Sequence, residues 1–350
     1  MTPLARKLPI AVSVLGSLCA CAQPAPAPPP DGTFQEVIFD RYSSLSRNEE
    51  IARRTLSPLT QRRGQQMLAA THQAFRDQPI DLTKERFTVY VPGGPPAKEG
   101  FGLLVFIAPW SEATRPQMWR PPLSRHGMIF VSAMSSGNDA KVLDRRMPLA
   151  LLAYENVLAR YPIDPKRVYV GGLSGGSRAA EMTALAYPDV FRGVLLNAGS
   201  DPIGGEAGNY LPPADLFHMF QETRLVYVTG DGDERNLHDD RISRASMRDW
   251  CVFDIEVKDA RKLGHEQLDQ RSFDLALAAL EKRGAIDAGE LARCNARLQR
   301  ELAARIAGIE TAIARGDREG ALARLKDVDG HYGSLAAPAI FELDARIAAR

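Results

Sequence analysis

The chain has 350 residues, 45% of them hydrophobic and 25% charged, and its formal net charge is +1. This length and composition predict one sizeable soluble domain with additions. The near-zero charge excludes the strongly basic surface that a nucleic-acid-binding protein would carry.

The N-terminus has the pattern of an export signal. Arg6 and Lys7 precede an apolar stretch over residues 8–20, which suits a signal peptide and is short for a membrane span. Two cleavage sites compete, an ordinary site between small residues and a bacterial lipobox that would make Cys21 the lipidated residue. We therefore predict a signal peptide over 1–21 and an exported protein that is periplasmic, membrane-anchored through Cys21, or secreted.

The body of the chain follows a Pro-rich segment, residues 22–33, which predicts an extended linker. We expect the main domain over 34–284, and the polar, helical pattern of 35–79 predicts helices that pack against the rest. Apolar strand-like runs then alternate with helical stretches such as 149–161, which indicates an α/β domain with a mostly parallel sheet and helices on both faces. The expected strands lie at 87–92, 102–108, 128–132, 167–171, 193–197, 225–229 and 252–257.

A Gly-x-Ser-x-Gly motif lies between one of these strands and a helix. The motif, Gly172-Leu173-Ser174-Gly175-Gly176, follows the strand-like run 167–170 and precedes the helical run 177–182. A tight strand-to-helix turn of this kind is typical of a nucleophile elbow, which makes Ser174 a candidate nucleophile. The alternative is a glycine-rich turn whose serine only caps the helix.

A serine nucleophile needs an acid and a base, and the chain supplies candidates for the acid after the next strand. The run 225–229 leads into a Gly-Asp-Gly-Asp turn, and we assign the acid to Asp233. Asp231 in the same turn is its close competitor, and Asp239 and Asp240 are more remote ones.

The expected base is His265, in a Leu-Gly-His-Glu loop between the strand at 252–257 and a helix that begins near Gln270. Its position completes the chain order serine, acid, histidine. His238 is its rival among the six histidines.

Five segments of the sequence resemble a known family. The segment Ile163-Asp164-Pro165-Lys166-Arg167-Val168-Tyr169-Val170, the Gly-Leu-Ser-Gly-Gly motif and the segment Ala186-Tyr187-Pro188-Asp189-Val190-Phe191 form the central block. Together with the run 87–92 and the Gly264-His265 turn, they resemble α/β-hydrolases of the polyhydroxybutyrate depolymerase and feruloyl esterase type. The resemblance covers about residues 85–283.

The resemblance implies an α/β-hydrolase fold and an exported serine esterase that cleaves small-molecule or polymeric esters through Ser174, His265 and Asp233. It implies no cofactor, and the sequence has neither paired Cys-x-x-Cys motifs nor a His-Glu-x-x-His helix that would predict a metal. The family usually has His-Gly after its third strand, where a backbone N–H helps to form the oxyanion hole. Here Pro109, which has no N–H, takes that place, so Trp110 and Gly175 are the expected donors. Trp110 can equally be a wall of the acyl pocket or a core residue.

The C-terminal residues 285–350 predict an all-helical extension. A long helix from Asp287 to Gly316 and two shorter ones, 317–328 and 335–349, each have an apolar face that must dock on the main domain or on a protein partner. After cleavage of the signal, Cys251 and Cys294 are the cysteines of the folded body, and they either form a disulfide or remain unrelated thiols.

Two other functions stay open. A serine peptidase of the prolyl-oligopeptidase type can carry the same elbow, although no propeller is evident in the sequence. A non-catalytic scaffold or binding protein of the cell envelope is the third candidate, because Pro109 departs from the family pattern and because the chain carries the helical extension.

Overall fold

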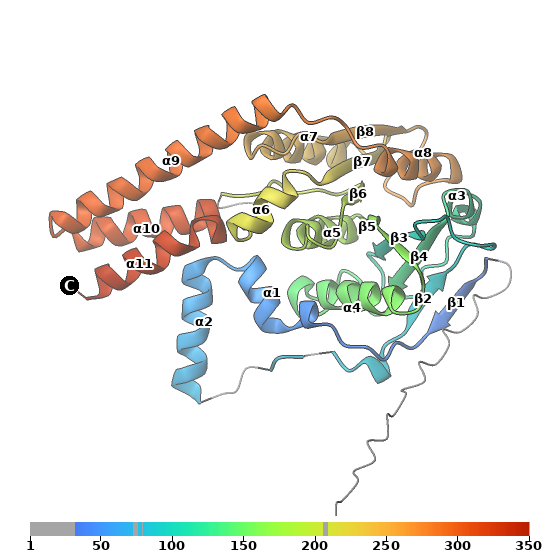
Figure 1. Ribbon diagram of the computed structural model, residues 1–350, viewed down its shortest axis with the longest axis horizontal. Helices are drawn as coiled ribbons and strands as arrows, with labels where there is room; N and C mark the ends of the chain where they lie inside the picture. The colour runs from blue at the N-terminus through green and yellow to red at the C-terminus, as the bar shows by residue number, and fades with distance from the viewer. Residues whose placement is uncertain (1–31, 73–75, 79, 206–208, 350) are drawn as a thin grey trace, which may run out of the picture.

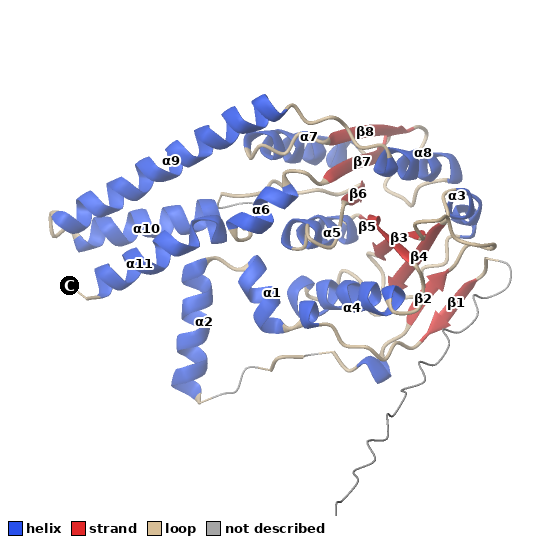
Figure 2. Cartoon of the chain, viewed as in Figure 1, coloured by secondary structure: helices blue, strands red, loops and turns tan. Residues whose placement is uncertain are grey.

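The computed structural model describes residues 32–72, 76–78, 80–205 and 209–349. The predicted signal peptide with Cys21, and the linker up to residue 31, lie outside the described residues. At the centre is an eight-stranded sheet with helices on both faces, and the C-terminal helices extend beyond it as an arm (Figures 1 and 2).

The strand order of the sheet is β1-β2-β4-β3-β5-β6-β7-β8. β2 is antiparallel to both β1 and β4, and all other neighbours are parallel. The reversal of β3 and β4 in the order places β3 directly beside β5, the strand that leads into the Gly-x-Ser-x-Gly motif. The strands are β1 Phe34–Val37, β2 Phe87–Tyr90, β3 Phe101–Ile107, β4 Met128–Ala133, β5 Ile163–Leu173, β6 Gly193–Asn197, β7 Arg224–Gly230 and β8 Ile255–Ala260.

All seven predicted strands are present, and β1 is a correction to the prediction. The segment 35–79 is not wholly helical, because its first residues pair with β2 at the edge of the sheet. An edge strand needs no apolar run, and the exposed Gln35 and Glu36 gave β1 a polar appearance. The central strands behave as predicted, since every residue of β3 and β6 is buried between helices on the two faces.

Two apolar cores lie on the two faces of the sheet. One core joins the sheet to α4, α5 and α7, and the other joins it to α3 and α8. The second core contains a stack of Trp119 on Phe273, with ring centroids 3.9 Å apart. The covering helices are α3 Arg120–Arg125, α4 Met147–Leu158, α5 Gly175–Ala186, α7 Glu234–Asp249 and α8 Gln270–Glu281, and the shorter helices beside them are α1 Asn48–Thr55, α2 Pro58–Thr71 and α6 Ala214–Phe220.

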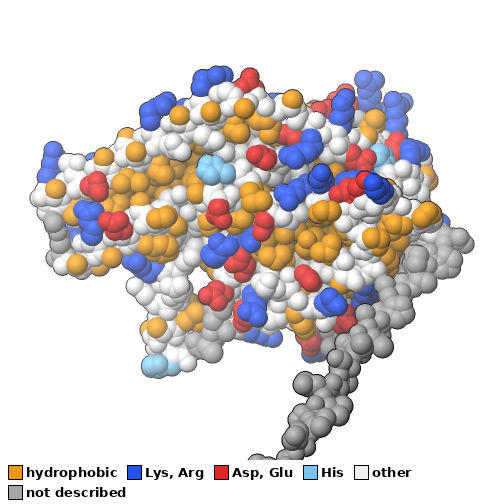
Figure 3. Space-filling view, viewed as in Figure 1, with side chains coloured by type: hydrophobic (Ala, Val, Ile, Leu, Met, Phe, Trp, Pro, Cys, Tyr) orange, Lys and Arg blue, Asp and Glu red, His pale blue; other side chains and the backbone are white. Residues whose placement is uncertain are grey.

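The arm consists of α9 Ala288–Ala314, α10 Arg318–Tyr332 and α11 Ala337–Ala348. Asp287 caps α9 by accepting a hydrogen bond from the Glu290 N–H, as the sequence predicted. With 27 residues, α9 is about 40 Å long. Hydrophobic side chains form a band along the arm (Figure 3). No helix in the described ranges is both long and apolar enough to cross a membrane.

The arm packs on the main domain through α2. The Asp329 carboxylate of α10 accepts hydrogen bonds from the Ser57 hydroxyl and the Leu59 N–H, at 2.7 and 2.9 Å, and so satisfies one of the first N–H groups of α2. Burial raises the pKa of Asp329, although these two hydrogen bonds oppose the rise. An Arg62–Asp344 ion pair joins α2 to α11. The predicted extension therefore docks on its own chain.

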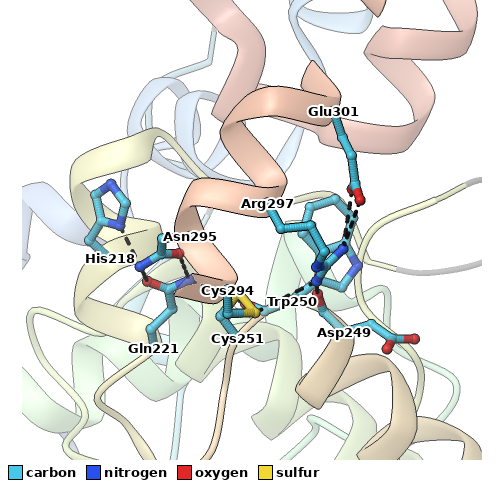
Figure 4. Close-up of a disulfide and its surroundings, with 9 residues drawn as sticks. All are labelled: His218, Gln221, Asp249, Trp250, Cys251, Cys294, Asn295, Arg297 and Glu301. Carbon is cyan, nitrogen blue, oxygen red and sulfur yellow. Dashed lines mark hydrogen bonds and ion pairs between the residues drawn. A yellow bond between two sulfur atoms is a disulfide. The ribbon is translucent and has the colours of Figure 1, made fainter. Parts of the chain in front are cut away.

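A disulfide between Cys251 and Cys294 joins the arm to the main domain at a second place (Figure 4). Cys251 is fully buried just after α7, and Cys294 lies in the second turn of α9. Beside it, Gln221 and Asn295 exchange hydrogen bonds of 2.7 and 3.1 Å between their side-chain amides. The covalent bond and this amide pair fix the start of α9 against the sheet domain.

Candidate active site

The Gly-x-Ser-x-Gly segment forms the turn between β5 and α5. Ser174 has φ +57° and ψ −124°, backbone angles that a non-glycine residue rarely adopts, and its N–H donates to the Asn197 carbonyl of β6 at 2.9 Å. The turn also lies close to β3, because a Cβ on Gly176 would collide with the Ile107 carbonyl oxygen and lie 3.0 Å from the Ala108 carbonyl carbon. These contacts hold the Ser174 side chain at the carboxyl end of the sheet.

The structure brings together the three side chains that the sequence singled out. His265 Nε2 lies 2.8 Å from Ser174 Oγ, and His265 Nδ1 lies 2.6 Å from Asp233 Oδ2. Asp233 follows β7 as the N-cap of α7, and His265 lies in the loop after β8, so the three residues extend from the same edge of the sheet. This geometry allows the imidazole to take a proton from the serine while the carboxylate holds the other ring nitrogen.

Asn236 is a fourth member of the site that sequence reasoning missed. Its side-chain amide donates to both carboxylate oxygens of Asp233, at 3.0 and 2.8 Å, and its Oδ1 accepts from Arg178 at 3.2 Å. Burial of Asp233 favours a higher pKa, but the hydrogen bonds from His265 and Asn236 outweigh burial and lower it. The signal in the sequence was the i+3 spacing from a helix-capping Asp233, which places Asn236 in the first turn of α7.

The other candidates for the acid and for the base lie outside the hydrogen-bonded chain of Ser174, His265 and Asp233. Asp231 is exposed and accepts from the Lys262 N–H at 2.8 Å, while Asp239 forms an ion pair with Arg178. Asp240 is buried and accepts from the hydroxyls of Ser200 and Thr229, and burial raises its pKa. The remaining rival, His238, is exposed, with no hydrogen bond to Ser174 among the contacts of the described chain.

The strand order, the strained serine after β5, the acid after β7 and the histidine after β8 together define the architecture. The chain has an α/β-hydrolase fold. The resemblance found in the sequence is therefore confirmed at the level of the fold.

The two backbone N–H groups that the sequence predicts as oxyanion donors follow β3 and Ser174. Pro109 follows β3 and supplies no N–H. The backbone N–H groups of Gly175 and Trp110 make no hydrogen bond among the described residues, so both are free to bind a ligand oxygen. Gly175 is also the first residue of α5, where the helix dipole favours negative charge.

Arg146 supports the chain just before Pro109. Its Nη2 donates to the Ala108 carbonyl at 3.0 Å, and its guanidinium is almost fully buried, with Nε lacking a partner in the described structure. Burial lowers the pKa of Arg146. The Trp110 indole is partly buried against the core on the α3 and α8 face and donates to Thr114 Oγ1 at 3.1 Å, which favours the packing role over a freely exposed pocket wall.

The described residues contain no group of three or more histidine, cysteine and acidic side chains that could hold a metal ion.

Comparison with known proteins gives one sequence match. No family model matches the chain. A segment of 51 residues is 47% identical to the poly(3-hydroxyalkanoate) depolymerase C of Paucimonas lemoignei. The matched segment covers 15% of this chain and 11% of the depolymerase.

Solved structures similar to this chain include a poly(3-hydroxybutyrate) depolymerase from Bordetella parapertussis, with 18% identity, a TM-score of 0.43 and coverage of 60% of this chain and 88% of that one. A ferulic acid esterase has 16% identity and a TM-score of 0.43 over 56% of this chain and 92% of its own. A thermostable esterase has 14% identity and a TM-score of 0.42 over 57% of this chain and 60% of its own. The fold assignment rests on the strand order and the elbow.

Proposed function

We propose that the protein is a serine hydrolase that cleaves carboxylic esters through an acyl-enzyme. The observation that carries this proposal is the chain of hydrogen bonds from Ser174 Oγ through the His265 imidazole to Asp233, on a serine with strained backbone angles. A serine that only capped a helix would need neither this histidine nor these angles.

In the proposed first step, Ser174 Oγ bonds to the ester carbonyl carbon, the carbonyl π electrons move to its oxygen, and the Oγ proton passes to His265 Nε2. The tetrahedral intermediate then breaks its bond to the alcohol oxygen, which takes the proton from Nε2. Water attacks the acyl-enzyme by the same route, again with His265 as base, and releases the acid. Asp233 holds the Nδ1 proton and stabilises the imidazolium in both halves of the cycle.

The surroundings of the serine favour a substrate that approaches from solvent. The His265 side chain is 48% exposed, whereas that of Asp233 is 7% exposed. A half-buried serine beside an exposed histidine, with a buried acid behind them, can accept an ester attached to a bulky alcohol or to a polymer. The short match to a poly(3-hydroxyalkanoate) depolymerase supports the polymeric class of ester.

A fluorophosphonate probe tests the proposal, because it reacts with activated serines. We expect the purified protein to be labelled at Ser174 and to hydrolyse p-nitrophenyl acetate, and we expect Ser174→Ala to lose both activities while keeping its circular dichroism spectrum. Ser177→Ala is a matched control one helical turn away, since the Ser177 hydroxyl donates to the Gly199 carbonyl and does not contact His265. A folded wild-type protein that is neither labelled nor active would refute the proposal and favour the scaffold alternative.

We further propose that the enzyme acts outside the cytoplasm. The disulfide supports this location, because disulfides persist in oxidising compartments. The export signal and Cys21, which would attach the protein to a membrane, remain predictions from the sequence.

A further inference from the structure

The loop after β4, which contains Ser135 and Asn138, lies beside the expected oxyanion donors, the N–H groups of Gly175 and Trp110. Backbone hydrogen bonds join this loop to the segment that carries Trp110. The Asn138 N–H donates to the Pro109 carbonyl at 3.0 Å, and the Ser135 N–H donates to the Ser111 carbonyl at 2.7 Å. These two hydrogen bonds lie on either side of Trp110. The position of the loop is therefore coupled to that of the Trp110 N–H.

The Asn138 side chain reaches from this loop to the first residue of α5. A Cβ built on Gly175 would lie 2.9 Å from Asn138 Cγ and 3.2 Å from Asn138 Nδ2, and closer still to Oδ1. The carboxamide thus contacts the backbone of Gly175, the residue directly after the nucleophile. Only a glycine at 175 leaves room for it.

The carboxamide has no other task in the structure. Asn138 is exposed, and its side chain makes no hydrogen bond within the described part of the protein. Rotation about its Cβ–Cγ bond can present either the oxygen or the NH₂ group to a neighbour. A developing oxyanion would select the NH₂ group, because it needs donors.

We propose that the Asn138 side chain is a third oxyanion donor, which compensates for the N–H that Pro109 cannot supply. This inference rests on the proposed ester hydrolysis and adds a catalytic residue to it. In the first step, Nδ2–H would donate to the carbonyl oxygen as it gains the π electron pair, beside the N–H groups of Gly175 and Trp110. A side-chain donor of this kind contributes on the order of a hundredfold to kcat.

The test compares wild-type protein with Asn138→Ala and Asn138→Asp. We expect a fall in kcat for p-nitrophenyl acetate on the order of a hundredfold with KM nearly unchanged, because the bond strengthens in the transition state. Asn138→Asp keeps the shape but replaces the donor with a negative charge, so its kcat should fall further. Asp139→Asn, on the same loop, should behave like the wild type because the side-chain oxygen of the substituted residue can still accept the hydrogen bond from the Ser111 hydroxyl.

A thionoester of the same acyl group separates a donor from a structural residue. Sulfur is a weaker hydrogen-bond acceptor than oxygen, so the ratio of the ester rate to the thionoester rate should fall when a donor is removed. Equal losses for both substrates in Asn138→Ala, or no loss at all, would overturn the Asn138 proposal while leaving the esterase proposal intact. A wild-type protein with no turnover and no fluorophosphonate labelling would overturn both.

Discussion

Replacing Cys251 and Cys294 together with alanine should lower the free energy of unfolding by about 4 kcal/mol. The disulfide closes a loop of 43 residues, and the loss of loop-closure entropy for a loop of this length is about 13 cal/mol/K, or about 4 kcal/mol at room temperature. The same change should leave kcat nearly unaltered. Asp233 caps the N-terminus of α7 and Cys251 follows its C-terminus, and the 16 residues of the helix separate them by about 24 Å.

Urea unfolding of the wild type and the double variant, followed by tryptophan fluorescence and by circular dichroism, measures the change. Trp250 lies next to the disulfide and packs on Tyr332 of α10, so its fluorescence reports on the junction of the arm and the main domain. Reduction of the wild type with dithiothreitol should give the same midpoint as the double variant. A loss below about 1 kcal/mol would refute the loop-closure argument. A large fall in kcat would show that the junction also positions the active site.

Two further variants test the hydrogen bonds from Asn236 to Asp233 and the contact of His126 with Glu281. Asn236→Ala removes both amide hydrogen bonds to Asp233 and should lower kcat about tenfold or more with a small change in KM. The reason is that hydrogen bonds to a charged group are worth about 1.5–3 kcal/mol. An unchanged kcat would exclude a positioning role for Asn236. Hydrogen bonding to Glu281 raises the pKa of His126, with burial opposing and Asp274 assisting. A raised pKa of His126 stabilises the folded state below about pH 6.5, and this stabilisation is lost as pH rises through the raised pKa. In urea titrations, His126→Gln should therefore lower the free energy of unfolding at low pH, and the difference from the wild type should fade above that value. A difference that does not depend on pH would contradict the role given to the His126–Glu281 contact.

The sequence was sufficient to predict those parts of the fold that depend on local pattern. The seven strands and the elbow follow from continuous apolar runs and from glycines beside Ser174, since a strand buried on both faces and a tight turn each restrict their own residues. The order serine, acid, histidine then placed Asp233 and His265 at loops on one edge of the sheet. Their hydrogen bonds required the structure.

The parts that were missed depend on neighbours far away in the sequence. Asn138 and Asn236 look like ordinary polar residues, and only the folded chain places one against Gly175 and the other against Asp233. The last strand begins three residues later than predicted, because Val252 completes the end of α7 through a hydrogen bond to the Met247 carbonyl. An apolar residue can be buried in a helix end as well as in a strand, and a local pattern does not distinguish the two.

The contact between α10 and α2 determines when the protein can finish folding. Ser57 and Asp329 are 272 positions apart, so the start of α2 has only its local cap, from Ser57 to the Thr60 N–H, until nearly the whole chain is present. Contacts over such a distance form slowly and leave apolar surface exposed in the meantime. A chain that stops short of α10 can assemble the sheet and seat α1, but it lacks the α10 partner of α2, so chaperone dependence should be greatest for such truncated chains.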